Sequence, residues 1–452
     1  MMKRPFAFVL CIFGVLFVSA VTACGSGGGG GKTPATPITQ FAVSGPEVPG
    51  ATAYDKAIIP IMQKWNIPGA AVAVAKNGRL VLARGYGYAD VENKVQVQPD
   101  SMFRIASISK PITAAAILHL AEQRKVDLEA KFLDILTDYT VPADADPRLR
   151  NVTIRHLLEH AGGWNRDVSG DPMFMSTEIA TSLGVPAPAS CSNVIQYMLG
   201  KKLDFDPGSK YAYSNFGFCI LGRVIEKVTG QSYETYVRDN VLAPMDIHAM
   251  RIGASSLSGR VAHEVKYYDY PGAPTTLSVF PGGGQVPMQY GGFYLEAMDA
   301  HGGWIASAVD LTRFMAALEG RRGAAFLSSN SLIDMTARPD VPQWSTTAYW
   351  YGLGITVRPA EVDANWWHNG ALRGGTTLLV RSYNGYDWAV LLNSRPSDTS
   401  KVDVEIDQAM WKALGTGLQG SPTDLYAQFP SPSLPPSQPA VRANAISAGK
   451  EH

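Results

Sequence analysis

The sequence lacks an excess of charge of either sign. Its 452 residues include 39 lysines and arginines and 39 aspartates and glutamates, so the formal net charge is zero. Proteins that bind nucleic acids carry a basic surface that neutralises phosphates, and this composition supplies no such excess. With 46% hydrophobic and 17% charged residues, the chain has an ordinary globular composition and enough length for a large core or more than one subdomain.

Cysteine is also scarce, with four in the chain. Cys11 lies in an N-terminal apolar run and Cys24 lies just after it, which leaves Cys191 and Cys219 as the candidate pair. In an oxidising compartment these two would close a loop of 28 residues, and such a disulfide stabilises a fold by about 3 to 4 kcal/mol. The alternative is two buried thiols, because Cys219 falls in an apolar run with a helical pattern.

The N-terminus is typical of an export signal: Lys3 and Arg4 precede an apolar run over residues 5–20 that is too short for a confident membrane span. The run ends in Val-Thr-Ala-Cys24, which resembles the lipobox of bacterial lipoproteins, whose cysteine is diacylated. The alternative is an ordinary secretory signal cut after small residues. Ser26, in place of aspartate, resembles lipoproteins sent to the outer membrane. We therefore expect a lipid-anchored protein of the bacterial cell envelope, facing the periplasm or the cell surface.

Composition divides the chain into four parts. Residues 1–23 form the signal, and residues 24–50 form a flexible linker rich in glycine and proline. Residues 51–418 hold the periodic segments of a globular domain. Residues 419–452 are rich in proline, serine and alanine without helical or strand periodicity, which predicts a disordered tail.

The first chemical motif is Ser107-Ile-Ser-Lys110, just before a predicted helix over residues 111–122 whose apolar residues recur at helical spacing. Three residues apart, the hydroxyl of Ser107 and the amine of Lys110 lie on one helical face. A serine hydroxyl is a poor nucleophile without a base in reach, and a lysine is one such base. Ser109 lies on another face. On its own the motif also fits a capping serine followed by a solvated lysine.

Two further motifs follow along the chain. Tyr213-Ser-Asn215 precedes a helix pattern that begins at Phe216, where a packed aromatic ring and an N-capping asparagine are the simpler explanation. His368-Asn-Gly370 precedes a predicted strand over residues 376–382, and an Asn-Gly turn then leads into a strand over 388–392. A similar hairpin is predicted over residues 71–84, so strands occur at both ends of the chain.

These three motifs, in this order, resemble the serine beta-lactamase and penicillin-binding-protein superfamily, in particular its class C beta-lactamase-like branch of D,D-peptidases, D-aminopeptidases and esterases. Ser107 and Lys110 match its S-x-x-K, Tyr213 and Asn215 its Y-x-N, and His368-Asn-Gly370 its H-x-G. Two further segments agree with the family, residues 157–163 and the Gly302-Gly303 to Asp310 stretch. The resemblance spans about residues 51–418.

The resemblance implies an α/β (α+β) fold, in which an antiparallel sheet built from both chain ends is flanked by helices and a mostly helical subdomain is inserted over about residues 107–250. It also implies a serine hydrolase that uses no cofactor or metal. Ser107 would be the nucleophile, Lys110 and Tyr213 the base that activates it, and the backbone N–H groups of Ser107 and Ala371 the oxyanion hole. Asn215, His368 and Gly370 would support the substrate.

His368 departs from the lysine that grips the substrate carboxylate in lactamases. A largely neutral imidazole grips a carboxylate less well, which favours ester or amide hydrolysis over penicillin turnover. Arg373 is a candidate for a substitute charge or for a surface salt bridge. The substrate is thus expected to be a small ester, amide or peptide. We expect the protein to contact the membrane through its N-terminal lipid. The alternative is a penicillin-binding or cell-wall-binding protein with little or no turnover.

Other patterns compete with this interpretation. His156-Leu-Leu-Glu-His160 has the order of an inverted zinc-peptidase motif, but two glycines end its helix at once. His301-Gly-Gly resembles the oxyanion loop of alpha/beta-hydrolases, yet the chain has no G-x-S-x-G elbow, so a tight turn is expected. The stretch over residues 254–300 is rich in glycine, proline and aromatic residues, and it either lines the cleft or covers the core.

Overall fold

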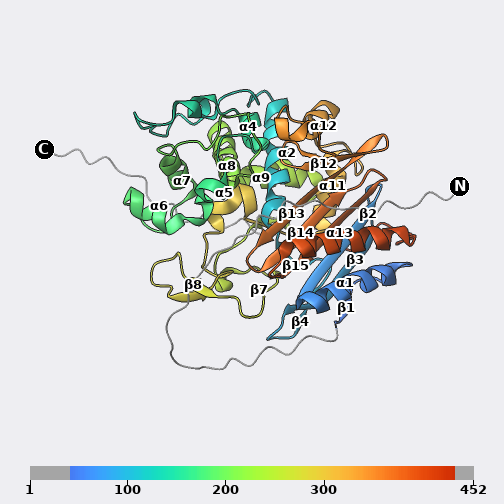
Figure 1. The fold of residues 1–452 in the computed structure, drawn as a ribbon. Coiled ribbons are helices and arrows are strands. Elements are labelled where there is room, and N and C mark those ends of the chain that lie inside the picture. Colours follow the sequence, from blue (N-terminus) through green and yellow to red (C-terminus); the bar gives the residue numbers. More distant parts are fainter. Residues whose placement is uncertain (1–40, 433–452) are drawn as a thin grey trace.

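A large antiparallel sheet dominates the computed structural model, which describes residues 41–432. The sheet has nine strands in the order β1-β3-β2-β15-β14-β13-β12-β11, with β4 paired to β3. Its strands are β1 (Val43–Ser44), β2 (Gly69–Lys76), β3 (Arg79–Asp90), β4 (Val95–Gln96), β11 (Trp350–Tyr351), β12 (Thr356–Ala360), β13 (Asp363–Leu372), β14 (Gly375–Arg381) and β15 (Tyr386–Leu392). Because β2 pairs with β15, strands from the two ends of the chain lie side by side, blue beside orange-red in Figure 1.

The central strands are apolar on both faces because both faces are covered. Along β2, alternate residues belong to two different clusters of the core, Ala70, Val72 and Val74 to one and Ala71, Ala73 and Ala75 to the other. Helices α1 (Ala51–Trp65) and α13 (Thr399–Gly415) lie together over the first face (Figure 1). Helix α11 (Ala308–Leu318) packs on the second face, against β2 and β15.

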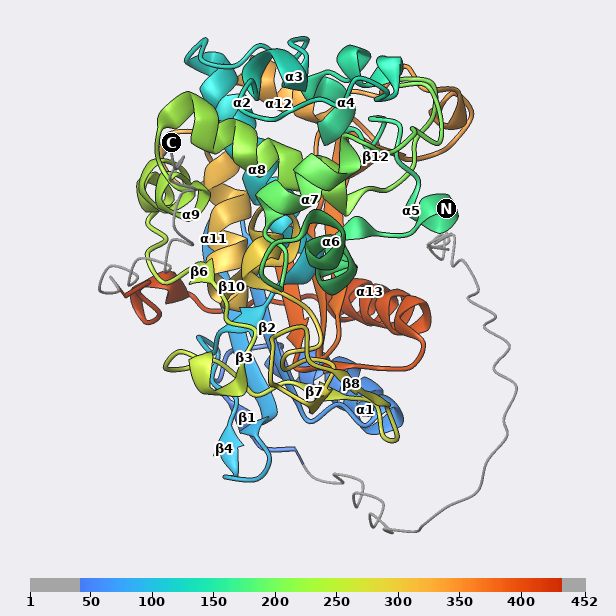
Figure 2. The same cartoon turned by 90° about the vertical axis from the view of Figure 1, so that its left-hand side faces the viewer.

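A helical region is inserted between the N-terminal and C-terminal parts of the sheet. Figure 2 shows it at the end of the molecule opposite α1 and β4. Its helices are α2 (Ser109–Glu122), α3 (Phe132–Ile135), α4 (Ile154–Leu158), α5 (Arg166–Ser169), α6 (Ser176–Leu183), α7 (Cys191–Met198), α8 (Asn215–Thr229) and α9 (Tyr233–Val237). This arrangement confirms the fold class that the sequence predicts.

Short strands and helices connect the two parts. The strands are β5 (Phe103–Arg104), β6 (Arg251–Ile252), β7 (Tyr268–Asp269), β8 (Thr275–Leu277), β9 (Gln285–Pro287), β10 (Trp304–Ala306) and β16 (Ser394–Arg395), and the helices are α10 (Asp299–Gly302) and α12 (Ser329–Thr336). The aromatic-rich stretch over residues 254–300 is tied to the core by buried Arg104, which donates to the carbonyl oxygens of Gln289 and Ala254, each at 2.7 Å.

The predicted domain boundaries need correction at both ends. The signal over residues 1–23 and Cys24 lie outside the described residues, but the predicted linker over 24–50 includes strand β1, which pairs with β3. The predicted tail over 419–452 begins too early, because Tyr426 is 2% exposed and donates a hydrogen bond to Thr312 Oγ1 at 3.0 Å. A short turn with one buried aromatic ring has no periodicity from which the sequence could reveal it. Among residues 41–432, no helix is both long and apolar enough to span a bilayer.

Candidate active site

Ser107 lies in a 3-10 turn, η1 (Ala106–Ile108), between strand β5 and helix α2. Ala106 has a φ of 48°, in the left-handed region that residues with a Cβ seldom adopt. Two hydrogen bonds hold the turn: Ser109 Oγ donates to the carbonyl oxygen of Ala106 at 2.7 Å, and Thr377 Oγ1 on β14 donates to that of Ile105 at 3.0 Å. Ser107 is the one residue between positions 101 and 110 that is not fully buried, so the turn presents its hydroxyl outward.

The amine of Lys110 lies on the first turn of α2 and is fully buried. Its Nζ is 3.2 Å from Ser107 Oγ, and it donates to Asn215 Oδ1 and to the carbonyl oxygen of His301, each at 2.8 Å. Burial, followed by the charge of Arg166, holds the pKa of Lys110 well below its usual value. A lowered pKa increases the share of neutral amine, which is the form that can accept a proton from a serine.

Asn215 is oriented by partners on both sides of its amide. Its Oδ1 accepts from Lys110, and its Nδ2 donates to Asp171 Oδ2 at 2.6 Å. Asn215 is the first residue of helix α8, and the side chain of Ser214 caps that helix by accepting from Gly217 N at 3.2 Å. The simpler explanation of Asn215 as the N-cap is therefore wrong, and its side chain is free to contact the lysine.

Tyr213 completes the cluster around Ser107. Its hydroxyl is hydrogen-bonded to Ser107, and Lys110 Nζ lies 4.8 Å from the centre of its ring. Burial raises the pKa of Tyr213 to about 12, although the Arg166 charge and the bond to Ser107 act in the opposite direction. The phenol therefore keeps its proton at neutral pH, which makes it a proton donor and leaves Lys110 as the better base.

His368 lies on β13 at the back of this cluster. Its ring centre is 6.5 Å from that of Tyr213, and its Nε2 is 3.0 Å from the hydroxyl of Tyr351. Burial, followed by the charge of Lys110, lowers the pKa of His368 to about 3. The imidazole is thus neutral, in agreement with the expectation that this residue does not grip an anion.

Gly370 lets strand β13 approach the turn that carries Ser107. A Cβ at this position would lie 2.4 Å from Thr377 Oγ1 and 2.5 Å from the carbonyl oxygen of Ile105, distances that no real Cβ tolerates. The close approach brings the next residue, Ala371, to the wall of a cavity that Ser107 also lines. Both residues predicted to form the oxyanion hole therefore face the same space.

That cavity has a volume of about 190 Å³. Its lining residues are Ser107, Arg166, Phe174, Asn215, His301, Gly302, Ala371, Leu372 and Arg395.

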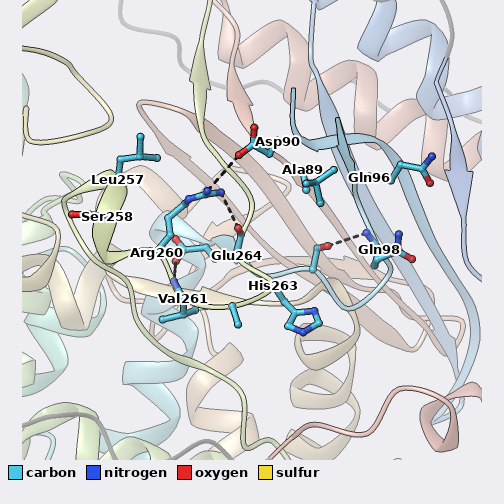
Figure 3. Close-up of a pocket in the computed structure, with 13 residues that line it drawn as sticks. Ala89, Asp90, Gln96, Gln98, Leu257, Ser258, Arg260, Val261, His263 and Glu264 are labelled. Atoms are coloured by element: carbon cyan, nitrogen blue, oxygen red, sulfur yellow. Dashed lines mark hydrogen bonds and ion pairs between the residues drawn. The ribbon is translucent and has the colours of Figure 1, made fainter. Parts of the chain in front are cut away.

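A larger hollow of about 500 Å³ lies elsewhere, between strand β3 and residues 257–264, and holds none of the predicted site residues. Figure 3 shows its Arg260 directed at Asp90, at 3.5 Å, and at the backbone oxygen of Glu264, at 3.1 Å. Its charges are satisfied internally, so we place the site at Ser107.

Several side chains that the sequence singled out have other partners. Arg373 forms an ion pair with Asp269 at 3.1 Å, which agrees with the salt-bridge alternative. His156 Nδ1 accepts from Thr153 N at the start of α4, and His160 Nδ1 accepts from Ser214 N at 3.1 Å. Among residues 41–432, no group of three or more histidine, cysteine, aspartate and glutamate side chains is arranged to hold a metal ion.

The His301-Gly302-Gly303 segment is not a loop of backbone donors. His301 and Gly302 lie in the short helix α10, and the carbonyl oxygen of His301 accepts from Lys110. The aromatic stretch over residues 254–300 supplies none of the cavity lining among the described residues. Its Phe293 packs behind the site, in a buried cluster with Ala106 and Leu372. Covering the core is thus the better account of this stretch.

Cys191 and Cys219 are joined by a disulfide, with their Cα atoms 6.1 Å apart. The bond links helix α7 to helix α8, and α8 begins with Asn215. It therefore braces the helix that carries a predicted site residue.

The sequence did not indicate four residues that shape this site. Asp171 orients Asn215, Tyr351 contacts His368, and Arg166 and Arg395 line the cavity. All four lie on short elements or turns whose residues show no periodicity. The sequence offered only a weak signal for these residues, namely that Arg166 and Arg395 are isolated arginines near turn residues.

The fold and the cluster define a class of proteins in which a serine just before a helix and a lysine on the first turn of that helix face a tyrosine that precedes a second helix. The chain belongs to the Beta-lactamase family, whose family model matches residues 54–409.

Curated relatives show more distant similarity. The chain is 28% identical over 224 residues to Protein flp of Staphylococcus aureus strain N315, covering 50% of this chain and 42% of that protein. It is also 28% identical over 341 residues to a probable fimbrial assembly protein, FimD of serogroup H1, from Dichelobacter nodosus, covering 69% of this chain and 77% of that protein. The match thus spans less than half the length of the staphylococcal relative.

Solved structures share the fold at low identity. An octameric penicillin-binding protein homologue from Pyrococcus abyssi superposes with a TM-score of 0.62 at 23% identity, covering 81% of this chain and 77% of that one. EstCE1, described as a hydrolase with promiscuous acyltransferase activity, gives 0.64 at 18% identity, covering 80% and 98%. The D-amino acid amidase of Ochrobactrum anthropi SV3 gives 0.62 at 20% identity, covering 81% and 99%. At these identities the likeness establishes the fold alone.

Proposed function

We propose that this protein is a serine hydrolase that cleaves ester or amide bonds through an acyl-enzyme on Ser107. The observation that carries the proposal is the 3.2 Å contact between Ser107 Oγ and the Nζ of a fully buried lysine whose pKa is lowered. A nucleophile with a base in hydrogen-bond reach, which a third group orients, is the arrangement that covalent catalysis requires. Here Asn215 is the third group.

In the acylation step, neutral Lys110 takes the proton of Ser107 while Oγ attacks the substrate carbonyl carbon. The carbonyl oxygen becomes an oxyanion, which the backbone N–H groups of Ser107 and Ala371 stabilise. When the tetrahedral intermediate collapses, the bond to the leaving group breaks and Tyr213 donates a proton to it. Tyr213 then recovers a proton from the Lys110 ammonium, so the lysine is neutral again.

Deacylation reverses these roles. A water molecule loses a proton through Tyr213 to Lys110 and attacks the acyl carbon, and Ser107 Oγ leaves as it regains the proton. The pKa of about 12 for Tyr213 suits a group that passes a proton on without remaining ionised. The neutral His368 supports simple esters and amides as substrates, because it adds no positive charge for the anionic ring substituent of a penicillin.

The test combines labelling with turnover. Purified protein is treated with a fluorophosphonate, the adduct is located by mass spectrometry, and hydrolysis of p-nitrophenyl butyrate and nitrocefin is measured with and without a chelator. We expect the adduct on Ser107 and chelator-resistant ester turnover that disappears in Ser107→Ala. Fragmentation of the labelled peptide distinguishes Ser107 from the neighbouring Ser109, whose hydroxyl donates to Ala106.

Each contrary result has its own meaning. An adduct on Ser107 without turnover of any ester or amide would favour a penicillin-binding or cell-wall-binding protein. Absence of an adduct together with chelator-sensitive activity would contradict the serine mechanism.

We also propose that the chain is anchored to the bacterial outer membrane by lipid on Cys24, supported by the residues Val21 to Cys24 that resemble a lipobox. The test is incorporation of an alkyne-labelled fatty acid, followed by fractionation of the envelope. Wild-type chain should carry the label in the outer-membrane fraction, and Cys24→Ala should carry none. Label that persists in Cys24→Ala would contradict the anchor.

A further inference from the structure

A guanidinium with no hydrogen-bond or ion-pair partner among the described residues lies in the wall of the Ser107 cavity. Arg395 belongs to the short strand β16 and is half-buried. Within residues 41–432 its guanidinium takes part in no hydrogen bond and no ion pair, whereas its neighbour Arg373 is paired with Asp269 at 3.1 Å. Arginine presents a planar fork of donors that fits a carboxylate, and a half-buried one is usually paired.

Nearby acids offset the charge of Arg395 only in part. Asp269 is engaged by Arg373, and Asp403 accepts from the amide of Asn369 at 2.8 Å. Burial raises the pKa of Asp403 to about 7, so only about half of this carboxyl is ionised at pH 7. Burial and the charge of Arg373 lower the pKa of Arg395, although Asp269 and Asp403 act in the opposite direction. The cavity wall therefore carries a positive charge that these acids offset only in part.

The position of Arg395 tells which part of a substrate it would meet. Arg166, which lines the cavity, lies 4.6 Å from the ring centre of Tyr213, the proton donor to the leaving group, and so marks the leaving-group side. The backbone of Arg395 pairs with that of Asp269 across strands β16 and β7, and Asp269 binds Arg373, two residues beyond the oxyanion residue Ala371 and on the side away from His368. A substrate whose carbonyl oxygen lies at Ala371 and whose leaving group lies near Tyr213 would extend its acyl group toward Arg395.

We propose that Arg395 binds a carboxylate at the end of the substrate's acyl group, so that this enzyme prefers short acyl chains with a terminal negative charge. This inference rests on the proposed function, because it uses the acyl-enzyme on Ser107 to fix the direction of the chain. The cavity of about 190 Å³ holds a short acyl chain and no large ring system. Half-esters and half-amides of small dicarboxylic acids are the chemical class that satisfies both conditions.

The test compares two substrates of equal length. In 4-nitrophenyl hydrogen glutarate a carboxylate replaces the terminal methyl group of 4-nitrophenyl pentanoate. Wild-type enzyme should favour the glutarate in kcat/KM, and Arg395→Met should lower the ratio of glutarate to pentanoate by at least about tenfold, because a charge-assisted hydrogen bond is lost. Arg395→Lys should restore part of the ratio, and rising salt should reduce it in wild type.

Lys401→Met is the matched control, since it removes one positive charge from an exposed side chain on α13 that pairs with Asp398. The ratio should not change in this variant. A third substrate, 3-carboxyphenyl pentanoate, carries its carboxylate on the leaving group. If Arg395→Met lowered turnover of this ester and left the ratio of glutarate to pentanoate unchanged, the assignment to the acyl side would be overturned. An equal loss for all three esters would also overturn it.

A binding measurement separates this inference from the proposed function. Free glutarate should raise the Tm of wild type and of Ser107→Ala, and it should leave the Tm of Arg395→Met unchanged. If no ester is hydrolysed but this pattern appears, the proposed hydrolase activity fails while the carboxylate site stands. If Ser107-dependent hydrolysis is observed but glutarate shifts wild type and Arg395→Met equally, the carboxylate site is overturned and the hydrolase remains.

Discussion

The amide nitrogen of Asn215 donates a hydrogen bond to the carboxylate of Asp171 at 2.6 Å. This contact fixes which end of the amide faces the cluster, because the carboxylate accepts only from the nitrogen. The oxygen of the same amide is thereby turned toward Lys110 Nζ, 2.8 Å away. Asp171 touches neither Ser107 nor the cavity, and it acts on the lysine through Asn215.

Replacing Asp171 by alanine should lower kcat/KM for a neutral ester by about tenfold, since a charged hydrogen bond that orients a site residue is lost. In Asp171→Asn, the oxygen of the new amide can still accept from Asn215, so most of the activity should return. Circular dichroism and Tm serve as controls for folding. Equal activity of Asp171→Ala and wild type would contradict the positioning role.

The pH dependence of kcat/KM should reveal the two charges that flank Lys110. The neutral amine is the active form, so activity rises as the pH rises through the pKa of Lys110. Arg166 lowers this pKa and Asp171 raises it. The acidic limb of the profile should therefore move to higher pH in Arg166→Gln and to lower pH in Asp171→Asn. If the acidic limb moved in the same direction in Arg166→Gln and in Asp171→Asn, Lys110 would be excluded as the base.

Lys110→Met should reduce kcat by about 10² to 10⁴, the range that a general base contributes. The fluorophosphonate adduct on Ser107 should form more slowly in the same variant, because this reaction also needs a deprotonated hydroxyl. The observed rate of adduct formation and the rate of ester hydrolysis should fall in parallel. A labelling rate equal to that of wild type would mean that another group activates Ser107.

Gly370→Ala should damage both stability and activity. The added methyl group would meet Thr377 Oγ1 at 2.4 Å and the carbonyl oxygen of Ile105 at 2.5 Å, and overpacking of this kind costs about 1 to 3 kcal/mol. The matched control is Gly375→Ala on the neighbouring strand, whose new Cβ would meet nothing closer than 3.7 Å. Urea unfolding and ester turnover should separate the two variants, and equal behaviour would contradict the close approach of β13.

Asp403 should make the protein less stable as the pH rises from about 4 to about 7. Burial raises its pKa from 3.8 to about 7, so the folded state binds the proton more tightly than the unfolded chain does, and this advantage is lost as the pH rises through the folded pKa. In Asp403→Asn the side chain cannot ionise, and its Oδ1 can still accept from Asn369. The variant should therefore have a flatter dependence of Tm on pH, measured between pH 4 and pH 8.

The sequence predicted those parts of the fold that have regular patterns. The Asn-Gly turns and alternating apolar residues located the central hairpins, and the three motifs located Ser107, Lys110, Tyr213, Asn215 and His368. It could not locate Asp171 or Arg395, because Asp171 reaches Asn215, and Arg395 reaches the cavity, only through the tertiary fold, from a short turn and a two-residue strand. Likewise the ordered turn around Tyr426 escaped prediction, since its stability comes from one buried ring and a hydrogen bond to Thr312.

The pairing of β2 with β15 has a consequence for when this protein becomes complete during its synthesis. A chain leaving the ribosome contains Ser107 and Lys110 early, but the strand that bears Gly370 and Ala371, and the strand β15 that closes the sheet, emerge some 260 residues or more later. Contacts between such distant segments form slowly. The nascent chain thus carries its nucleophile for most of translation without an oxyanion pocket beside it, and reactivity arises only once the last third has been made.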